Sequence, residues 1–520
     1  MSARGNVRSI SAHRGRIDRI GARKKLRNAA LVAAGILAVP AGAVADPYQQ
    51  APAGQQAAAP QQAPAPQQQE TQQQAGAPVQ PAAGPASTDP ALLQRLDALE
   101  HTVTSLQNTV FDVREQANQP PPKTTKVTTK GGLKVESEDG AFSFQAIGRL
   151  QIDAAFYDQD KSKLGDGVQL RRARLGAQGK LFSDWQYKLE VDFAGEAAAV
   201  KDAFISYIGW APAQFTIGNF YEPFCLECIS SEAFTTFMER ALPITQPTSS
   251  FDPDRHLGVG AAHYDDNWSA SVGAFMKNLS DAQPAGEGDQ QFDVAGRFTY
   301  DPIVDKDKLL HFGVSGRYSS PSASQPVFRL KPESNVTNAR FLDTGAAGLT
   351  NVDHLYEISP ELALVYGPAS LQGEYFFVPV ERTHPSGANT PSVTLTGWYA
   401  FASYFLTGES RNYNPQIARF DRISPNKNLG SGGGWGAFEL AARVSQADYD
   451  DGPTFQFGTE TNYTIGLNWY ANPYIKFMLN YILVQNNASA TGNKANLLPG
   501  ITSDSYDNPR ILELRAQVDW

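Results

Sequence analysis

The 520-residue sequence lacks the features that mark several common protein classes. It has two cysteines, too few for a disulfide-built scaffold. Its seven histidines are scattered, and it has neither a G-x-S-x-G elbow nor a metal-binding histidine spacing. We therefore expect no enzyme activity, metal site or cofactor, although a Ser/His/Asp set assembled on neighbouring strands stays open.

Long apolar runs are also scarce. One run, Ala29 to Ala45, approaches the ~20 residues that a membrane helix needs. It follows a leader with nine Lys and Arg residues and ends in Ala43-Val44-Ala45. This pattern predicts a secretory signal peptide over 1–45, cleaved before Asp46, and the alternative is a retained N-terminal anchor.

Removal of that leader changes the charge of the chain. The full sequence carries −9, and residues 1–45 carry nine basic residues against one acid, Asp18, a net of +8. Subtracting +8 from −9 leaves a mature chain of about −17. A nucleic-acid partner is not expected, because it would need a basic surface.

The segment before residue 141 divides into three parts. Residues 46–86 are rich in Gln, Ala and Pro and predict a disordered linker. Asp89-Pro90 is typical of a helix start, so we expect a helix over 87–119. Its apolar residues recur at spacings of three and four: Leu92, Leu96, Leu99, Val103, Leu106, Val110 and Val113. This seam predicts a short coiled coil or an amphipathic helix packed on its own barrel, and residues 120–140 are predicted to be a linker.

The last ten residues introduce the pattern of the remaining chain. Apolar and polar residues alternate from Leu512 to Trp520, the side-chain period of a β-strand. A soluble sheet would explain one such strand equally well. A length of about ten residues and an aromatic end favour a tilted strand that crosses a membrane.

This alternation returns in sixteen segments, an even number, as single-chain bacterial barrels have. The predicted strands are 141–157, 168–180, 186–193, 201–208, 214–220, 257–265, 268–276, 291–300, 309–318, 355–366, 370–380, 393–406, 435–446, 460–470, 474–484 and 511–520. Connections after odd-numbered strands are mostly long and the others mostly short, as in membrane barrels. The long connection 407–434 breaks this rule, so a missed pair of short strands stays open. The predicted fold is an all-β, 16-stranded antiparallel transmembrane β-barrel over 141–520 with an N-terminal coiled-coil helix.

Polar residues of such a barrel face inward, around a water-filled lumen. The predicted inward cations are Arg149, Arg172, Arg174, Lys180, Lys188, Arg297, Arg317, Arg443 and Arg515. Rings of Arg or Lys in a pore select anions. Alternatively, many of these cations pair with lumenal acids, as Arg443 could with Glu439 and Arg515 with Glu513.

Two stretches stand out within the predicted barrel. Arg171, Arg172 and Arg174 are close together in the sequence and have no acidic residue beside them. We therefore expect an anionic group to bind them and neutralise their charge. The connection 221–256 is apolar enough to fold into the lumen and narrow it. It holds Cys225 and Cys228, which we expect to form a local disulfide outside the inner membrane.

Six stretches of the barrel region resemble the phosphate-selective porin O/P family. They are LRRARLG (170–176), DWQYK (184–188), GNFYEPF (218–224), FMER (237–240), GGWGAFELAAR (433–443) and GLNWY (466–470). The resemblance implies an outer-membrane barrel, usually a homotrimer, that passes phosphate-type anions. It would place Arg171, Arg172 and Arg174 at or near the constriction and Arg240 in the inserted loop. Tyr221, where relatives often have lysine, and the two cysteines depart from the family pattern.

The leading hypothesis is thus a passive porin in the outer membrane of a Gram-negative bacterium. Its expected partners are the surrounding lipid and the small anionic solutes that pass through it. Its N-terminal segment would be periplasmic and could contact the cell wall. A general or sugar-diffusion porin is the alternative within this class. From another class, the protein could be a tether between the outer membrane and the cell wall.

Overall fold

The computed structural model describes residues 90–118, 125–129, 131–195, 197–244, 254–276, 291–321, 326, 328–344, 349–383, 391–430, 433–453, 455–487, 498–501 and 506–520. The signal peptide and the Gln/Ala/Pro linker predicted over 1–86 lie outside these residues. The chain divides into a unit that contains Thr125–Trp520 and a unit, Tyr48–Thr124, that contains helix α2. Among the described helices, none is long and apolar enough to cross a membrane.

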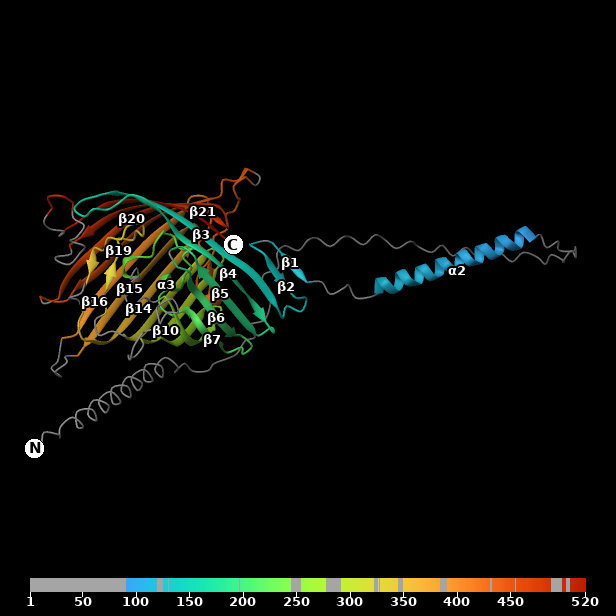
Figure 1. The fold of residues 1–520 in the computed structure, drawn as a ribbon, viewed down its shortest axis with the longest axis horizontal. Coiled ribbons are helices and arrows are strands. Elements are labelled where there is room, and N and C mark those ends of the chain that lie inside the picture. Colours follow the sequence, from blue (N-terminus) through green and yellow to red (C-terminus); the bar gives the residue numbers. More distant parts are fainter. Residues whose placement is uncertain are drawn as a thin grey trace, which may run out of the picture. The chain divides into compact units, whose positions relative to one another are not determined.

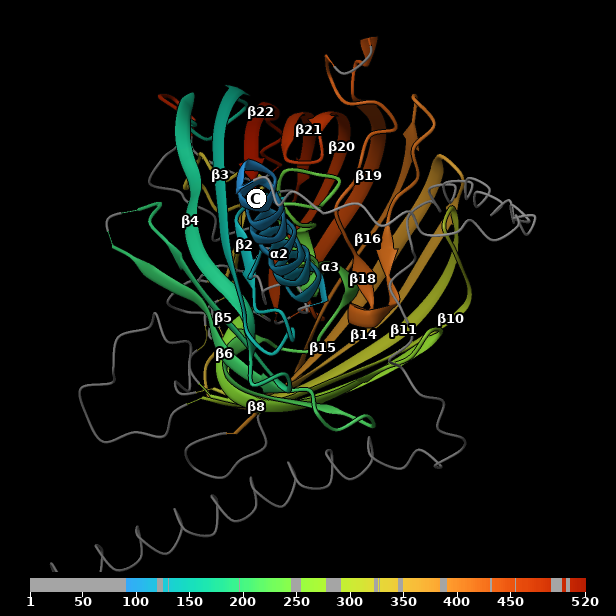
Figure 2. The ribbon, with the colours of Figure 1, turned by 90° about the vertical axis from the view of Figure 1, so that its right-hand side faces the viewer.

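The larger unit is a closed antiparallel β-barrel of sixteen long strands (Figures 1 and 2). They are β3 (Ser143–Asp158), β4 (Gly167–Leu181), β5 (Trp185–Asp192), β6 (Ala199–Tyr207), β7 (Gln214–Tyr221), β8 (Arg255–Tyr264), β9 (Trp268–Phe275), β10 (Phe292–Asp305), β11 (Lys308–Ser320), β14 (Val352–Tyr366), β15 (Ala369–Arg382), β16 (Val393–Phe405), β19 (Ala437–Asp450), β20 (Gln456–Asn472), β21 (Ile475–Asn486) and β22 (Arg510–Asp519). Pairing of β22 with β3 closes the ring. Each predicted strand is confirmed, with ends displaced by a few residues.

The two faces of the strands have the polarity of a membrane barrel. In β22, Glu513 and Arg515 point to the interior and are buried, whereas Leu512 and Leu514 lie on the outer, exposed face. The same inversion is seen in β14, where Glu357 and Glu361 are buried and Leu362 and Leu364 are exposed. A soluble barrel would bury its apolar face instead. An apolar outer face suits lipid, as the alternation predicts.

The connections fall into two groups. Those after β3, β7, β11 and β21 emerge at one end, the long-loop end, and the tight turns after β4, β8 and β14 lie at the other, the short-turn end. The exception is again the connection after β16. It holds a hairpin of β17 (Tyr413–Asn414) and β18 (Arg419–Phe420) with the short helix η2 (Pro415–Ile417) between them. These strands pair with each other and not with the wall, so the barrel keeps sixteen strands.

The region predicted as a linker, 120–140, is structured in part. It contains β1 (Lys126–Thr128) and β2 (Lys134–Glu136), which pair with each other. β2 also pairs with the start of β3 and so extends the wall beside the chain end. The prediction missed them because three-residue strands carry too little periodicity to detect.

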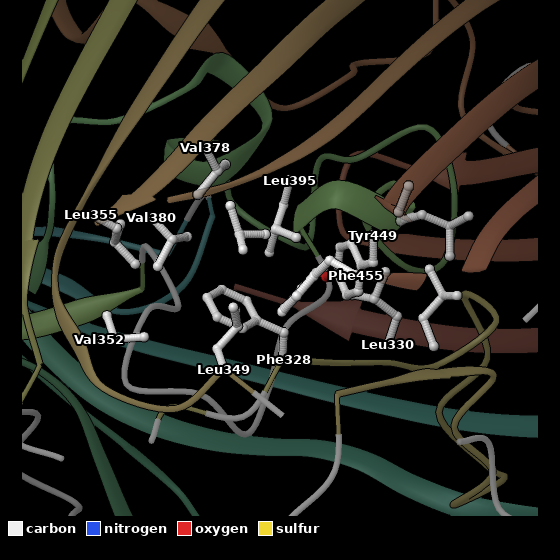
Figure 3. Packing of buried hydrophobic residues seen from close by; sticks show 14 residues of the cluster. Phe328, Leu330, Leu349, Val352, Leu355, Val378, Val380, Leu395, Tyr449 and Phe455 are labelled. Atoms are coloured by element: carbon white, nitrogen blue, oxygen red, sulfur yellow. The ribbon is translucent and has the colours of Figure 1, made fainter. Parts of the chain in front are cut away.

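The connection 321–351 turns back into the barrel at the long-loop end. It carries the paired strands β12 (Arg329–Leu330) and β13 (Leu342–Asp343). Phe328, Leu330 and Leu349 pack there against wall residues such as Val380 and Tyr449 (Figure 3). Apolar side chains therefore occupy part of the lumen at this level, where the sequence predicted water.

Helix α2 (Pro90–Asn118) agrees with the predicted helix within three residues at its start. Leu99, Leu106 and Val110, three members of its apolar seam, are well exposed in the single chain. The seam is available for helix pairing, and the coiled coil stays a prediction.

Candidate functional site: an arginine cluster facing an inserted loop

The described part of the connection from β7 to β8, residues 222–244, is folded into the barrel, and we call it the inserted loop. Its Phe224 and Phe237 are buried in one cluster with Tyr399 and Phe401 of β16. It carries the short helix α3 (Leu226–Ile229), which the strands surround in Figure 2. The apolar content of the loop accounts for this position, because these rings leave water when they pack on the wall.

Polar contacts fix the loop in place. The backbone N–H groups of Leu226 and Glu227 donate to the two carboxylate oxygens of Glu374 on β15, each at 2.8 Å. Cys225 and Cys228 form a disulfide within this turn. Arg240 donates to the carbonyl oxygens of Glu227 and Cys228, at 3.1 and 2.7 Å. Arg240 therefore cross-links the loop itself.

Glu232, at the tip of this arrangement, lies among four arginines. Its carboxylate oxygens are 3.1 Å from Arg149, 3.5 Å from Arg174, 3.7 Å from Arg240 and 3.9 Å from Arg172. The Tyr221 hydroxyl also donates to it, at 3.1 Å. The anionic group that the arginine-rich stretch requires is thus a carboxylate of the same chain.

Glu239 makes the second link between the loop and the same wall. Arg171 holds it through two hydrogen bonds, Nε to Oε1 at 2.8 Å and Nη2 to Oε2 at 3.0 Å. Arg515 of β22 reaches the same carboxylate at 2.7 Å and also pairs with Asp153. Two arginines on neighbouring parts of the wall therefore share one loop carboxylate.

A β-bulge explains how Arg171 and Arg172 both face the interior. Gln151 pairs with Arg172 while the next residue, Ile152, pairs with Leu170, so Arg171 is the extra residue on β4. Strict alternation would have sent Arg171 to the lipid face. The bulge resets the alternation and brings a third arginine inside.

Further acids surround the arginines of β4 and their neighbours. Arg174 pairs with Glu190 and Asp192 of β5, at 3.1 and 2.9 Å. Asp202 of β6 pairs with Lys188 at 2.7 Å and with Arg255 of β8 at 2.8 Å. Arg255 also pairs with Asp254, at 3.0 Å. Together these ion pairs involve eight cations and seven carboxylates, which we call the arginine cluster. The cations are Arg149, Arg171, Arg172, Arg174, Lys188, Arg240, Arg255 and Arg515, and the carboxylates are Asp153, Glu190, Asp192, Asp202, Glu232, Glu239 and Asp254.

The cluster carries a net charge of about +1 when all its groups are ionised. Two of its guanidinium donors, Arg149 Nε and Arg172 Nε, are buried and have no hydrogen-bond partner among the described residues. These donors give the site unused capacity for an anionic oxygen.

The electrostatics keep both loop acids ionised. Burial acts to raise the pKa of Glu239, but the guanidinium groups of Arg171 and Arg515 outweigh it and hold the pKa well below the usual range. Burial opposes ionisation of Glu232 in the same way, and Arg174 and Arg172 lower its pKa further than burial raises it. Both carboxylates therefore act as fixed negative charges.

Four of the predicted inward cations lie outside this cluster, and one of them, Lys180, is exposed near the end of β4. Arg297 pairs with Glu361 at 2.6 Å, and Arg317 with Glu222 at 3.0 Å. Arg443 pairs with Glu333 of the connection 321–351 at 2.9 Å. Pairing with lumenal acids was the alternative that the sequence left open, but the suggested partners were wrong. Arg443 does not pair with Glu439, nor Arg515 with Glu513, because inserted segments and a neighbouring strand offer closer acids.

The connection 406–436 meets the inserted loop from the short-turn end. Arg419 donates to the carbonyl oxygen of Ile229 at 2.7 Å. Arg297 of the wall donates to the carbonyl oxygen of Ala418 at 3.0 Å. A cavity of about 160 Å³, lined by residues that include Thr216, Tyr221 and Arg419, lies beside this junction. The connection that broke the length rule is thus a third segment folded inward, after the inserted loop and the connection 321–351.

The sequence placed Glu190 and Asp192 on the inward face, but it missed the loop residues that neutralise the cluster. Glu232 carried no motif, and Glu239 lay within the FMER stretch without an assigned role. Arg255 begins a strand two residues before its predicted start. The acids could have been found from the prediction that the loop enters the lumen. A loop that lies beside three buried arginines should carry the carboxylates that neutralise them.

Comparison with known proteins agrees with this architecture. A sixteen-stranded membrane barrel whose polar interior is narrowed by an inserted loop defines a porin. The family model of phosphate-selective porin O and P matches residues 144–520. The chain belongs to this family, and it is a porin of the Gram-negative outer membrane.

Two relatives cover most of the chain. An uncharacterised protein of Caulobacter vibrioides is 30% identical over 426 residues, which are 76% of this chain and 82% of the relative. Porin O of Pseudomonas aeruginosa is 27% identical over 401 residues, 71% of this chain and 88% of the relative. Among solved structures, an anion-selective porin from Comamonas acidovorans is 12% identical with a TM-score of 0.47, and the match covers 73% of this chain and 100% of that one.

Proposed function

We propose that this porin passes small anions, with phosphate-type oxyanions preferred, along the arginine cluster. The observation that supports the preference is the pair of buried donors at Arg149 Nε and Arg172 Nε, which have no acceptor among the described residues. A shift of either arginine side chain away from Glu232 would present its donor to the anionic oxygen of a solute. The description of the matching family points to the same class of solute.

The loop carboxylates suggest how an anion moves without being trapped. The Glu232 carboxylate lies between Arg149 and Arg174, in the position that the oxygens of a phosphate ion would take. A fully unpaired set of eight cations would bind an anion too tightly to release it, whereas conduction needs binding weak enough to leave. Resident carboxylates leave a small positive surplus, so anions enter and exit by exchanging contacts with Glu232 and Glu239.

A second candidate is a general diffusion pore without strong charge preference. The near balance of eight cations and seven carboxylates favours it, because a surplus of about one charge is partly screened at physiological salt. The reversal potential under a chloride salt gradient separates the two hypotheses. An anion filter gives a reversal potential near the equilibrium potential of chloride, and a general pore gives one near zero.

The remaining organisation is proposed as follows. Residues 1–45 are a signal peptide and 46–86 a linker, and the short-turn end with the N-terminal segment faces the periplasm, as short turns do in such barrels. Three chains assemble as a homotrimer, and the seam of α2 forms a coiled coil between them. Changing both Leu99 and Leu106 to Asp should leave the barrel folded and abolish cross-links between α2 helices of one trimer.

The test of the proposed function is block of chloride current by inorganic phosphate in planar bilayers. Arg172→Gln removes one charge and one unused donor while Glu232 keeps Arg149 and Arg174. We expect phosphate block in the wild type and block weakened by about tenfold in the variant, the loss of one charge-assisted contact. Arg329→Gln is the matched control, since Arg329 also pairs with an acid, Asp343, but away from the cluster. Absence of phosphate block, or equal block in both variants, would contradict the proposal.

A further inference from the structure

A separate group of ionisable side chains lies where the inserted loop joins the wall. Glu222 follows the last residue of β7, His256 is the second residue of β8, and Asp293 is the second residue of β10. Glu222 and Asp293 are 0% exposed and His256 is 6% exposed. One nitrogen or oxygen atom from each lies within 4.8 Å of the others.

The contacts of this group leave one oxygen unused. His256 Nδ1 and Glu222 Oε1 are 2.8 Å apart, and Arg317 donates to the other Glu222 oxygen at 3.0 Å. Asp293 Oδ2 accepts from Gln291 at 2.6 Å. Asp293 Oδ1 is buried and forms no well-aligned hydrogen bond among the described residues, and the Ser319 hydroxyl, which faces it across the strand pair and interacts with it, has no other partner there. A buried carboxylate oxygen without a partner marks a place where something else binds.

The charges of the group do not balance. Arg317 pairs with both Glu222 and Glu357, so Glu222, Glu357 and Asp293 oppose one arginine. With His256 neutral, two negative charges remain in a buried position, which is costly without compensation. Two protons or one divalent cation would restore neutrality.

We propose that Glu222, His256 and Asp293 bind one divalent cation of the zinc class. One imidazole nitrogen and two carboxylates match the ligands that Zn²⁺ accepts, and three protein ligands leave a position for water. Mg²⁺ and Ca²⁺ prefer oxygen ligands alone, so the imidazole selects against them. A single cation satisfies the unused Asp293 oxygen and removes the surplus charge.

The position of the ligands gives the ion a structural consequence. Glu222 and His256 flank the two ends of the inserted loop, and Asp293 belongs to the wall. A bound ion would tie both ends of the loop that narrows the pore to β10. Because the ligands meet only in the folded barrel, the ion should stabilise the barrel and hold the loop.

Zinc titration of the full mature chain, purified without a polyhistidine tag, tests the site. We expect about one Zn²⁺ per chain, and an affinity at least about tenfold lower in Asp293→Asn and His256→Gln, since each loses a ligand. His354→Gln is the matched control. His354 Nδ1 also lies beside an acid, Asp353, at 2.9 Å, but the structure brings no third ligand of this kind to it. That variant should bind zinc as the wild type does.

X-ray absorption of the zinc-loaded wild type makes the test independent of how the variants fold. The proposal expects one imidazole and otherwise oxygen ligands. Failure of the wild type to bind stoichiometric zinc would overturn it. So would a shell of several imidazoles, or an affinity that is equal in the wild type and in folded Asp293→Asn protein.

Discussion

Arg171 and Glu239 form a two-point ion pair between a bulge in the barrel wall and the loop that enters the lumen. The pair depends on an irregularity of β4, because a regular strand would point Arg171 toward lipid. It helps to fix the loop at the level of the arginine cluster, so the same contact holds the loop and neutralises part of the charge of the wall.

Glu239→Gln tests this coupling. The amide keeps the size of the side chain but cannot hold Arg171 and Arg515 with charge-assisted bonds. We expect a loss of about 1–3 kcal/mol in the free energy of unfolding, with higher conductance and noisier open channels as the loop loosens. Thermal unfolding and single-channel recording measure both. Asp343→Asn, which breaks a more exposed pair with Arg329, should change neither.

Lys331, in the connection 321–351, should make the channel sensitive to mildly alkaline pH. Burial, together with the nearby guanidinium groups of Arg340 and Arg171, lowers the pKa of Lys331 to about 8. Raising the pH from 7 to 9 should therefore remove the positive charge of Lys331 and reduce anion preference, and Lys331→Met should weaken that dependence. Between pH values near 8 and near 10.5, Lys331 is protonated in the unfolded chain but neutral in the folded chain. The unfolded chain therefore binds more protons, and the contribution of Lys331 to the free energy of unfolding rises with pH. Reversal potentials measured at pH 7 and pH 9 test this prediction. If the variant responds to pH as the wild type does, Lys331 is not the group whose deprotonation changes the anion preference.

Arg419→Gln tests whether the connection 406–436 acts as a second constriction. The substitution removes the hydrogen bond from Arg419 to the Ile229 carbonyl oxygen, one of the contacts between this connection and the inserted loop. We expect increased conductance and unchanged folding, judged from heat-modified mobility on gels. Conductance identical to that of the wild type would show that this connection does not limit the current.

The strands could be predicted from the sequence because their signal is local. A period of two over ten or more residues identifies a strand and its two faces, as in β22. The length of the connections then identifies the two ends. The inward fold of the inserted loop followed from its apolar residues, which need a surface to pack on.

The partners within the lumen could not be predicted, because they depend on contacts between distant segments. Arg443 meets Glu333 more than one hundred residues away, and Arg171 enters the lumen through a bulge that no local pattern marks. The three proposed metal ligands, Glu222, His256 and Asp293, likewise come from three separate strand ends. The sequence therefore showed no metal-binding spacing.

The most direct test of the account is the reversal potential of Glu232→Gln under a salt gradient, compared with the wild type and with Asp343→Asn. Glu232 lies among four arginines, and its neutralisation raises the surplus of the cluster from about +1 to about +2. The account predicts an anion-selective wild type, stronger anion selectivity in Glu232→Gln, and no change in Asp343→Asn. A cation-selective wild type, or a Glu232→Gln channel with unchanged selectivity, would contradict the assignment of the arginine cluster as the filter.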